Sequence, residues 1–320
     1  YTMVGGFLAV SLTDFVQGVI MMLALVIMPL VVMFGSGGEA GGSIADVPVE
    51  GFLSLTEGLT LLGFVSAVTW GLGYFGQPHI LVRFMAADSV KTIPNARRIG
   101  MAWMILTLAG AVAVGFFGIA YFAGHPELAG PVSENGERVF MELVKILFNP
   151  WVAGIILSGV LAAVMSTLSA QLLVSSSALT QDFYKAMLRK NASQTELVWV
   201  GRAMVLLIAL IAIGIASNPD SKVLGLVSYA WAGFGAAFGP VVLISLVWKR
   251  MTRNGALAGM LVGAITVVVW KEFIGLGLYE IIPGFILASI AIYVVSIMGK
   301  EPAASIQQRF EVANAEYHAG

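Results

Sequence analysis

The chain has 320 residues, of which 58% are hydrophobic and 11% are charged, and its formal net charge at pH 7 is −1. Soluble domains carry about 25% charged residues, so this composition excludes an ordinary soluble protein and indicates an integral membrane protein in a lipid bilayer. A net charge this close to zero indicates no nucleic-acid partner, and the lack of cysteine excludes disulfides, thiolate metal sites and cysteine nucleophiles.

Eight apolar runs are long enough to cross a membrane, because a spanning helix needs about 20 residues. Only helices and closed barrels satisfy their backbone hydrogen bonds in lipid, so we expect an all-α integral membrane protein of about eight transmembrane helices plus an N-terminal helix stub. The runs are approximately 11–34, 59–81, 99–123, 148–178, 198–217, 223–248, 255–274 and 279–298.

Residues 1–10 are apolar but lack the basic region and the cleavage site of a signal peptide. We interpret them as the end of an earlier helix, and the chain as a fragment of a longer protein. Lysine and arginine are retained on the cytoplasmic side of a membrane. If residue 11 starts on that side, all but four of the 17 basic residues lie there, and the polar tail 299–320 is also cytoplasmic.

Asp14 is an ionisable residue just inside the first span, in the sequence AVSLTDFVQ. Ionisable side chains within a span are functional candidates by default. A carboxylate this close to the cytoplasmic end of a span can also be solvated or can pair with an arginine of a loop. The residues alone leave both interpretations open.

The second run contains WGLGYFGQPH, residues 70–79, in which three glycines and a proline oppose a continuous helix. Glycine costs about 1 kcal/mol and proline about 3 kcal/mol relative to alanine inside a helix, so we expect a break near Gly73 to Gly76. Unwound backbone at membrane depth persists only where protein or a water-filled cavity satisfies it. Interrupted helices of this kind build ligand sites in many secondary transporters.

Trp70, Tyr74 and Pro78 are four residues apart and would share one face of a helix. Trp70 also lies well inside its span, as Trp231 does, whereas the other five tryptophans lie near span ends, where this residue is usually found. This spacing leaves two interpretations open. One is an aromatic wall for a small ligand with an apolar body and charged ends, and the other is a proline kink packed through small residues.

An outer segment, 133–148, places five apolar residues on one face of a helix: Val139, Phe140, Leu143, Val144 and Leu147. This pattern predicts an amphipathic helix that lies on the membrane surface or folds over an entrance. The sequence favours a surface helix without a gating role.

Hydroxyl groups are concentrated in LAAVMSTLSAQLLVSSSALT, residues 161–180. Ser166 and Thr167 follow Ala163 by three and four residues, so on a helix their hydroxyls point back toward its carbonyl. Three neutral oxygens at this spacing are half of a cage for a hard cation such as Na⁺, which needs a second wall. Serine and threonine in such helices more often bond their own backbone or a neighbouring helix, and the sequence by itself favours that structural role.

The sequence contains no phosphate-binding loop, no HExxH and no dinucleotide fingerprint, so we do not expect an enzyme. Five segments together resemble the sodium:solute symporter family, and GYFGQPHIL and MSTLS within them are the specific ones. The segments are YTMVGGFLAVSLTDFVQGVIMM, WGLGYFGQPHILVRFMAADS, FFGIAYF, AAVMSTLSAQLLVSSSALTQDFYK and GLVSYAWAGFGAAFGPVV. The resemblance extends over essentially the whole chain.

The resemblance implies a partial inverted-repeat fold of the leucine-transporter type, in which two five-helix repeats of opposite topology hold sites between them. In such a fold, residues 1–34 would be the end of the first repeat, comprising a helix stub and its last helix. Residues 59–248 would form the second five-helix repeat, 249–298 two peripheral helices and 299–320 a cytoplasmic tail.

The resemblance also implies roles for the residues found by spacing. The substrate contacts would be Trp70, Tyr74 and Pro78. The sodium ligands would be the carbonyl of Ala163 and the hydroxyls of Ser166 and Thr167. Asp14 would be a functionally sensitive acid.

The implied function is sodium-coupled symport of L-proline across the bacterial inner membrane by alternating access, with Na⁺ as the co-transported ion and no other cofactor. A complete member of the family begins several helices earlier, and its interrupted first helix supplies the opposite wall of both sites. We therefore expect the missing N-terminal helices of the same protein as a partner, and no transport by this chain alone. The alternatives are symport of another solute such as pantothenate, a symporter-like domain of a membrane sensor, and a structural subunit without transport.

Overall fold

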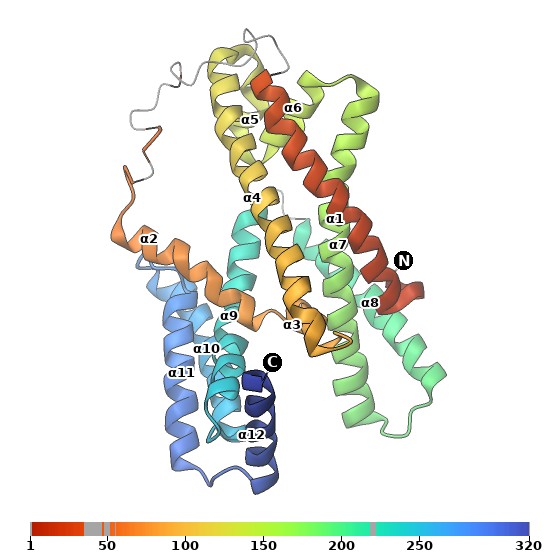
Figure 1. Ribbon diagram of the computed structural model, residues 1–320, viewed down its shortest axis with the longest axis vertical. Coiled ribbons are helices and arrows are strands. Elements are labelled where there is room, and N and C mark those ends of the chain that lie inside the picture. Colours follow the sequence, from red (N-terminus) through yellow and green to blue (C-terminus); the bar gives the residue numbers. More distant parts are fainter. Residues whose placement is uncertain (1, 35–46, 48–51, 55, 218–221, 320) are drawn as a thin grey trace. The chain divides into compact units, whose positions relative to one another are not determined.

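The computed structural model describes residues 2–34, 47, 52–54, 56–217 and 222–319, and within these ranges the chain forms helices and no strand (Figure 1). Seven of the described helices are long and apolar enough to cross a membrane, and a shorter apolar helix lies at Leu61–Gly76. The seven are Gly5–Phe34, Val90–Gly124, Pro150–Leu188, Gln194–Ala216, Val223–Val247, Arg253–Ile274 and Ile281–Met298. These elements confirm seven of the eight predicted spans, and the eighth run, 59–81, contains the shorter apolar helix and an interruption.

The chain forms two compact units, each built from two separate stretches of sequence. The first unit comprises Tyr1–Ser54 and Thr92–Ala212, and the second comprises Leu55–Lys91 and Ile213–Gly320. The predicted second repeat, 59–248, therefore contributes helices to both units.

The first unit contains the long helices α1 (Thr2–Phe34), α4 (Ile93–Gly124), α7 (Pro150–Ser177) and most of α8 (Gln194–Ala216). Short helices lie between α4 and α7, and a π-helical segment follows α7. The short helices are η4 (Pro126–Leu128), α5 (Gly130–Glu134), η5 (Gly136–Arg138) and α6 (Val139–Leu147), and the π-helical segment is η6 (Ala178–Leu188). The short η3 (Val90–Thr92) precedes α4 at the point in the sequence where the two units divide. Helix α1 packs against both α4 and α7.

The helix α1 is kinked at Gly6, whose φ of 57° and ψ of −151° are not helical. Glycine adopts a positive φ without steric cost, which makes this residue the end of the predicted N-terminal stub. The continuous helix therefore begins near Phe7, earlier than the predicted start at residue 11. As a consequence, Asp14 lies eight residues beyond the kink, about 12 Å along the helix axis at about 1.5 Å per residue.

The amphipathic segment forms α6, and its apolar face is buried in the first unit. Leu143 and Val144 are fully buried in a cluster that also contains Met28 of α1 and Ile156 of α7. The predicted amphipathic helix is thus present, its apolar face is covered by the same unit, and its place at the membrane surface stays a prediction. The apolar face packs onto α1, α4 and α7 because it finds apolar partners within the same chain.

The second unit contains the interrupted helix, followed by a helical bundle. The interrupted helix consists of α2 (Leu61–Val68), the 3₁₀ segment η2 (Thr69–Gly76) and α3 (Pro78–Met85). The bundle consists of α9 (Val223–Val247), α10 (Arg253–Val269) with the π-helical η7 (Trp270–Ile274), and α11 (Ile281–Met298), and α12 (Ala304–Ala319) follows it in the chain. Its core contains Ala232 and Ala236 of α9, Val267 of α10 and Ile281 of α11.

Three glycines at four-residue intervals, Gly255, Gly259 and Gly263, form one face of α10. A Cβ atom on any of them would overlap atoms of a neighbouring helix: Ser296 or Ile292 of α11, or the Ala236 carbonyl of α9. Small residues spaced in this way let membrane helices approach until their backbones touch. Helices α9, α10 and α11 are therefore held together through close contacts of their main chains.

Candidate functional site

The interrupted helix changes conformation where the glycines and the proline predicted a break. The α-helix ends at Val68, a 3₁₀ helix runs from Thr69 to Gly76, and Gln77 is extended, with φ of −81° and ψ of 112°. Pro78 is then the first residue of α3, a position where the missing N–H of proline is not needed. The predicted break near Gly73 to Gly76 is confirmed.

The 3₁₀ conformation changes the angle around the helix axis between the side chains of Trp70 and Tyr74. Successive residues of a 3₁₀ helix are rotated by about 120°, so residues four apart do not lie on the same face. The predicted stripe of Trp70, Tyr74 and Pro78 on one helical face is therefore wrong. Pro78 lies beyond the extended Gln77, and the two aromatic rings are brought together by a third ring instead.

The third ring belongs to Trp231 of α9. The rings of Trp70 and Trp231 are nearly parallel, with centroids 5.5 Å apart, and the ring of Tyr74 meets Trp231 edge-on at 4.8 Å. Trp70 is also nearly parallel to Tyr279, at 6.0 Å. Such offset and edge-on geometries are those that aromatic pairs prefer. The four rings, Trp70, Tyr74, Trp231 and Tyr279, are called the aromatic cluster below.

The glycines of the interrupted helix explain how closely it approaches α9. A Cβ on Gly73 would overlap the indole of Trp231, and a Cβ on Gly76 would overlap the carbonyl of Phe234. These contacts confirm the packing interpretation for both glycines. Because Tyr74 lies between them and remains 45% exposed, the same packing leaves an aromatic surface that a ligand could contact.

Polar side chains satisfy backbone carbonyls of the interrupted helix. The indole N–H of Trp231 donates to the carbonyl of Trp70 at 2.9 Å. The amide of Gln77, a side chain only 3% exposed, donates to the carbonyls of Gly73 at 3.2 Å and Trp231 at 3.3 Å. Carbonyls at membrane depth need such partners, so these two side chains complete the local structure.

Sequence reasoning missed Trp231, Gln77 and Tyr279 as members of this site. The one signal was the depth of Trp231 within its span, which marked it as exceptional without identifying its partner. Tyr279 lies in the loop before α11, and its hydroxyl donates to the carbonyl of Ser228 at 2.8 Å. Burial, with a smaller contribution from the charge of Glu280, raises the pKa of Tyr279, so the hydroxyl remains a donor at neutral pH.

The predicted sodium ligands lie in the first unit, on an α-helical part of α7. The hydroxyl of Ser166 donates to the carbonyl of Ala163 at 3.1 Å, which is the backbone bonding that the structural interpretation expected. Thr167 is exposed and Ser166 is half-buried. Their positions within one turn keep the three oxygens close together.

A cavity of about 260 Å³ lies between α1, the η5–α6 segment and α7, and Ala163 lies on its wall. Among the residues that line it, Met21 and Ala24 belong to α1, and Phe140 belongs to α6. The wall is mainly apolar, with Glu137 as its one ionisable residue. Of the predicted sodium ligands, only Ala163 lines this cavity.

Asp14 lies at intermediate exposure within α1, in the same unit as the hydroxyl-rich part of α7. Within α1, Asp14 lies eight residues, or about two turns, beyond the kink at Gly6. Asp14 thus lies within the apolar span Gly5–Phe34, and its functional role stays a prediction.

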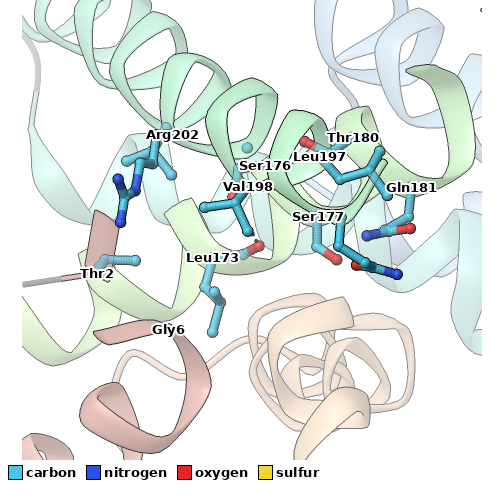
Figure 2. A pocket seen from close by; sticks show the side chains of 13 residues that line it. Thr2, Gly6, Leu173, Ser176, Ser177, Thr180, Gln181, Leu197, Val198 and Arg202 are labelled. Carbon is cyan, nitrogen blue, oxygen red and sulfur yellow. Dashed lines mark hydrogen bonds between the residues drawn. The ribbon is translucent and has the colours of Figure 1, made fainter. Parts of the chain in front are cut away.

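A second cavity in the first unit, of about 270 Å³, is lined by aliphatic side chains together with hydroxyl and amide groups, and Figure 2 shows it from close by. Ser177 and Gln181 reach it from the end of α7 and from η6, Arg202 reaches it from α8, and Thr2 from the start of α1. None of the residues predicted for the substrate or the cation lines it. It is therefore separate from the residues on which the proposals below rest.

Comparison with known proteins places these residues in a family. Residues 1–263 match the model of the sodium:solute symporter family. The chain is 64% identical over 320 residues to the sodium/proline symporter of Escherichia coli (strain K12), covering 99% of this chain and 64% of that protein. It is 51% identical over 314 residues to the high-affinity proline transporter PutP of Bacillus subtilis (strain 168), covering 97% of this chain and 65% of that protein. The chain thus spans about two thirds of the length of these relatives.

A solved structure supports the fold. A Na⁺-coupled sialic acid symporter in a substrate-bound, outward-open state aligns with 95% of this chain and 66% of its own, with a TM-score of 0.71 and 18% sequence identity. This likeness confirms the all-helical transporter fold that the resemblance implied. Because the family model covers most of the chain and close relatives cover nearly all of it, the chain belongs to the sodium:solute symporter family.

Proposed function

We propose that the protein containing this chain is a sodium-coupled L-proline symporter of the bacterial inner membrane that works by alternating access. The observation that carries the proposal is the 3₁₀ interruption, which brings Trp70 and Tyr74 onto Trp231. The names of the close relatives, which are proline transporters, support the same substrate. On this proposal the protein moves its substrate without changing it chemically, so no catalytic residue is needed.

The aromatic cluster has the chemistry that proline requires. Proline has an apolar five-membered ring that can lie against an aromatic face, and a positively charged amine that such a face attracts. We assign substrate contact to Trp70, Tyr74 and Pro78. The exposed ring of Tyr74 and the position of Pro78 directly after the extended Gln77 support this assignment.

We assign sodium coordination to the carbonyl of Ala163 and the hydroxyls of Ser166 and Thr167. Neutral oxygen ligands suit a hard cation, and secondary transporters use backbone carbonyls in this way. Asp14 of α1 is assigned separately, as an acid on which transport depends, and not as a sodium ligand. The exposure of Ala163 and Thr167 on α7 supports access for the ion.

Sodium and proline would be coupled because each favours a conformation that binds the other, and such coupling is equal in both directions. At a membrane potential of −100 mV, one positive charge moving inward supplies about 2.3 kcal/mol toward accumulation of proline. With the basic loops on the inner side, the C-terminal helix α12 would be cytoplasmic. The division into the end of one repeat, a second repeat of 59–248 and two peripheral helices is part of this proposal.

Uptake of radiolabelled proline tests the function. The protein encoded by the complete reading frame is reconstituted in liposomes, and uptake is measured with a gradient of Na⁺ and then with choline in its place. We expect uptake to depend on Na⁺ and to be competed by proline but not by pantothenate. Equal uptake with choline contradicts sodium coupling, and competition by pantothenate contradicts the assigned substrate.

A further inference from the structure

We propose that Trp231 and Gln77 are positioning residues that hold the interrupted helix against α9 in the orientation that the substrate site needs. Two side chains carry this role, and together they are called the Trp231–Gln77 bridge. The indole of Trp231 donates to the carbonyl of Trp70 at 2.9 Å, and the amide of Gln77 donates to the carbonyls of Gly73 and Trp231. The inference deepens the proposed function and rests on it.

The bridge is reciprocal, because each helix supplies both a side chain and a backbone carbonyl. Trp231 reaches from α9 to the backbone of η2, and Gln77 reaches from the end of η2 back to the backbone of α9. The partners are 161 and 154 residues apart in the chain, so these bonds fix tertiary structure rather than local conformation. The bonds therefore restrain both the distance and the rotation of η2 relative to α9.

Packing alone does not explain the two side chains. Ring contacts with Trp70 and Tyr74 require only an aromatic ring at position 231, yet the indole N–H is also paired with a carbonyl. A buried amide at position 77 costs free energy unless it is hydrogen-bonded, and an apolar side chain would fill the same space without that cost. The hydrogen-bonded polar groups of Trp231 and Gln77 therefore indicate that these residues fix the orientation of η2 relative to α9.

The bridge acts directly on Trp70. Its carbonyl is tied to Trp231 while its ring lies nearly parallel to the same indole, so the backbone and the ring of Trp70 are fixed by one residue. Gly73 has no side chain, and its carbonyl is tied by Gln77. Loss of either donor removes a hydrogen bond between η2 and α9 and allows η2 to rotate, which moves Trp70 and Tyr74 out of their joint orientation.

The test uses variants that remove the donors and preserve bulk. Trp231→Phe keeps an aromatic ring without the N–H, and Gln77→Leu keeps a similar volume without the amide. The matched control is Trp103→Phe, because the indole of Trp103 in α4 also donates to a backbone carbonyl at 2.9 Å, that of Gly18 in α1, in the other unit. All variants are made in the protein encoded by the complete reading frame.

The first measurement is hydrogen exchange of the backbone amides of residues 69–76 in the purified protein without substrate. We expect exchange there to be at least several-fold faster in Trp231→Phe and in Gln77→Leu, and unchanged in Trp103→Phe. This measurement does not depend on which substrate is transported. Because it follows one segment within a folded protein, it also separates loosening of η2 from general unfolding, which would accelerate exchange in every helix.

The second measurement is uptake kinetics. We expect each bridge variant to raise the KM for proline about tenfold, the change that loss of one buried hydrogen bond produces, with a smaller effect on the maximal rate. The double variant should raise KM by less than the product of the single effects, because both residues restrain the same segment. The control variant should keep the KM of the wild type.

The outcomes distinguish the two proposals. Unchanged exchange in residues 69–76 and an unchanged KM in both bridge variants overturn the bridge. The bridge is also overturned if the double variant raises KM by the full product of the two single effects, because the two residues would then act separately. If the wild type takes up no proline in a sodium gradient, the proposed function fails, while faster exchange in both variants still supports the bridge as a restraint on η2.

Discussion

Gly73 and Trp231 touch so closely that a single methyl group on Gly73 would occupy the space of the indole. We expect Gly73→Ala to lower the free energy of unfolding by about 1–3 kcal/mol, because overpacking forces side chains or backbone to shift. The measurement is the thermal unfolding temperature of the purified protein. Gly71→Ala is the control, because a Cβ on Gly71 meets no atom within 4 Å. Equal unfolding temperatures for the two variants would contradict the contact.

Thr167 provides a test of the proposed cation site. We expect Thr167→Val, which keeps the shape of the side chain without its oxygen, to raise the Na⁺ concentration for half-maximal uptake at least tenfold. Loss of one ligand costs about 1–3 kcal/mol, and 1.4 kcal/mol is tenfold. Thr107→Val is the control, because the hydroxyl of Thr107 is bonded to the carbonyl of Trp103 within α4. A normal sodium dependence in Thr167→Val would exclude this ligand.

A substitution at Asp14 tests whether this residue is a functional acid or a solvated charge. We expect Asp14→Asn to reduce sodium-driven proline uptake at least tenfold at unchanged protein levels, because ionisable side chains within an apolar span such as Gly5–Phe34 are usually functional. The measurement is initial uptake rate, normalised to the amount of protein in the membrane. Asp88→Asn, at an exposed position in a loop, is the control. Uptake of Asp14→Asn at the wild-type rate would favour the solvated interpretation.

Tyr279 gives a prediction about pH. Burial raises its pKa above the usual 10.0, so the folded protein holds the phenolic proton more tightly than the unfolded chain does. The resulting stability is fully present below pH 10 and is lost as the pH rises through the higher pKa of the folded state. We expect Tyr279→Phe to be less stable than the wild type by about 1 kcal/mol at pH 8, because the bond to Ser228 is lost.

The difference between Tyr279→Phe and the wild type should become smaller above pH 10, since only the wild type carries this titrating group. The measurement is the thermal unfolding temperature of both proteins at intervals between pH 8 and pH 11. A difference that stays constant over this interval would mean that Tyr279 is not buried in the folded protein.

The sequence predicted those parts of the fold that depend on length, composition and local backbone chemistry. The spans follow from about 20 apolar residues in lipid, and the break follows from the cost of Gly73, Gly76 and Pro78 in a helix. The continuous part of α1 after the kink begins about four residues before the predicted start at residue 11, because apolar residues continue through Gly6 and only its φ marks the kink.

The contacts within the candidate site could not be predicted, because they depend on segments distant in sequence. The pairing of Trp70 with Trp231 spans 161 residues, and spacing rules describe only residues on the same helix. The same rules assumed an α-helix at Trp70 and Tyr74, where the structure has a 3₁₀ helix. The burial of α6 was also missed, because an amphipathic face shows that a partner exists but does not identify it.

The glycine face of α10 has a practical consequence for probes. The chain contains no cysteine, so one introduced cysteine would be its single thiol. Leu257, Leu261 and Ile265 of α10 are exposed and can carry a spectroscopic label. Gly255, Gly259 and Gly263 cannot, because main-chain contact leaves no room for a side chain. Labels at the exposed positions would therefore move with α9, α10 and α11 as one group. They would provide the reference against which displacement of the interrupted helix is measured.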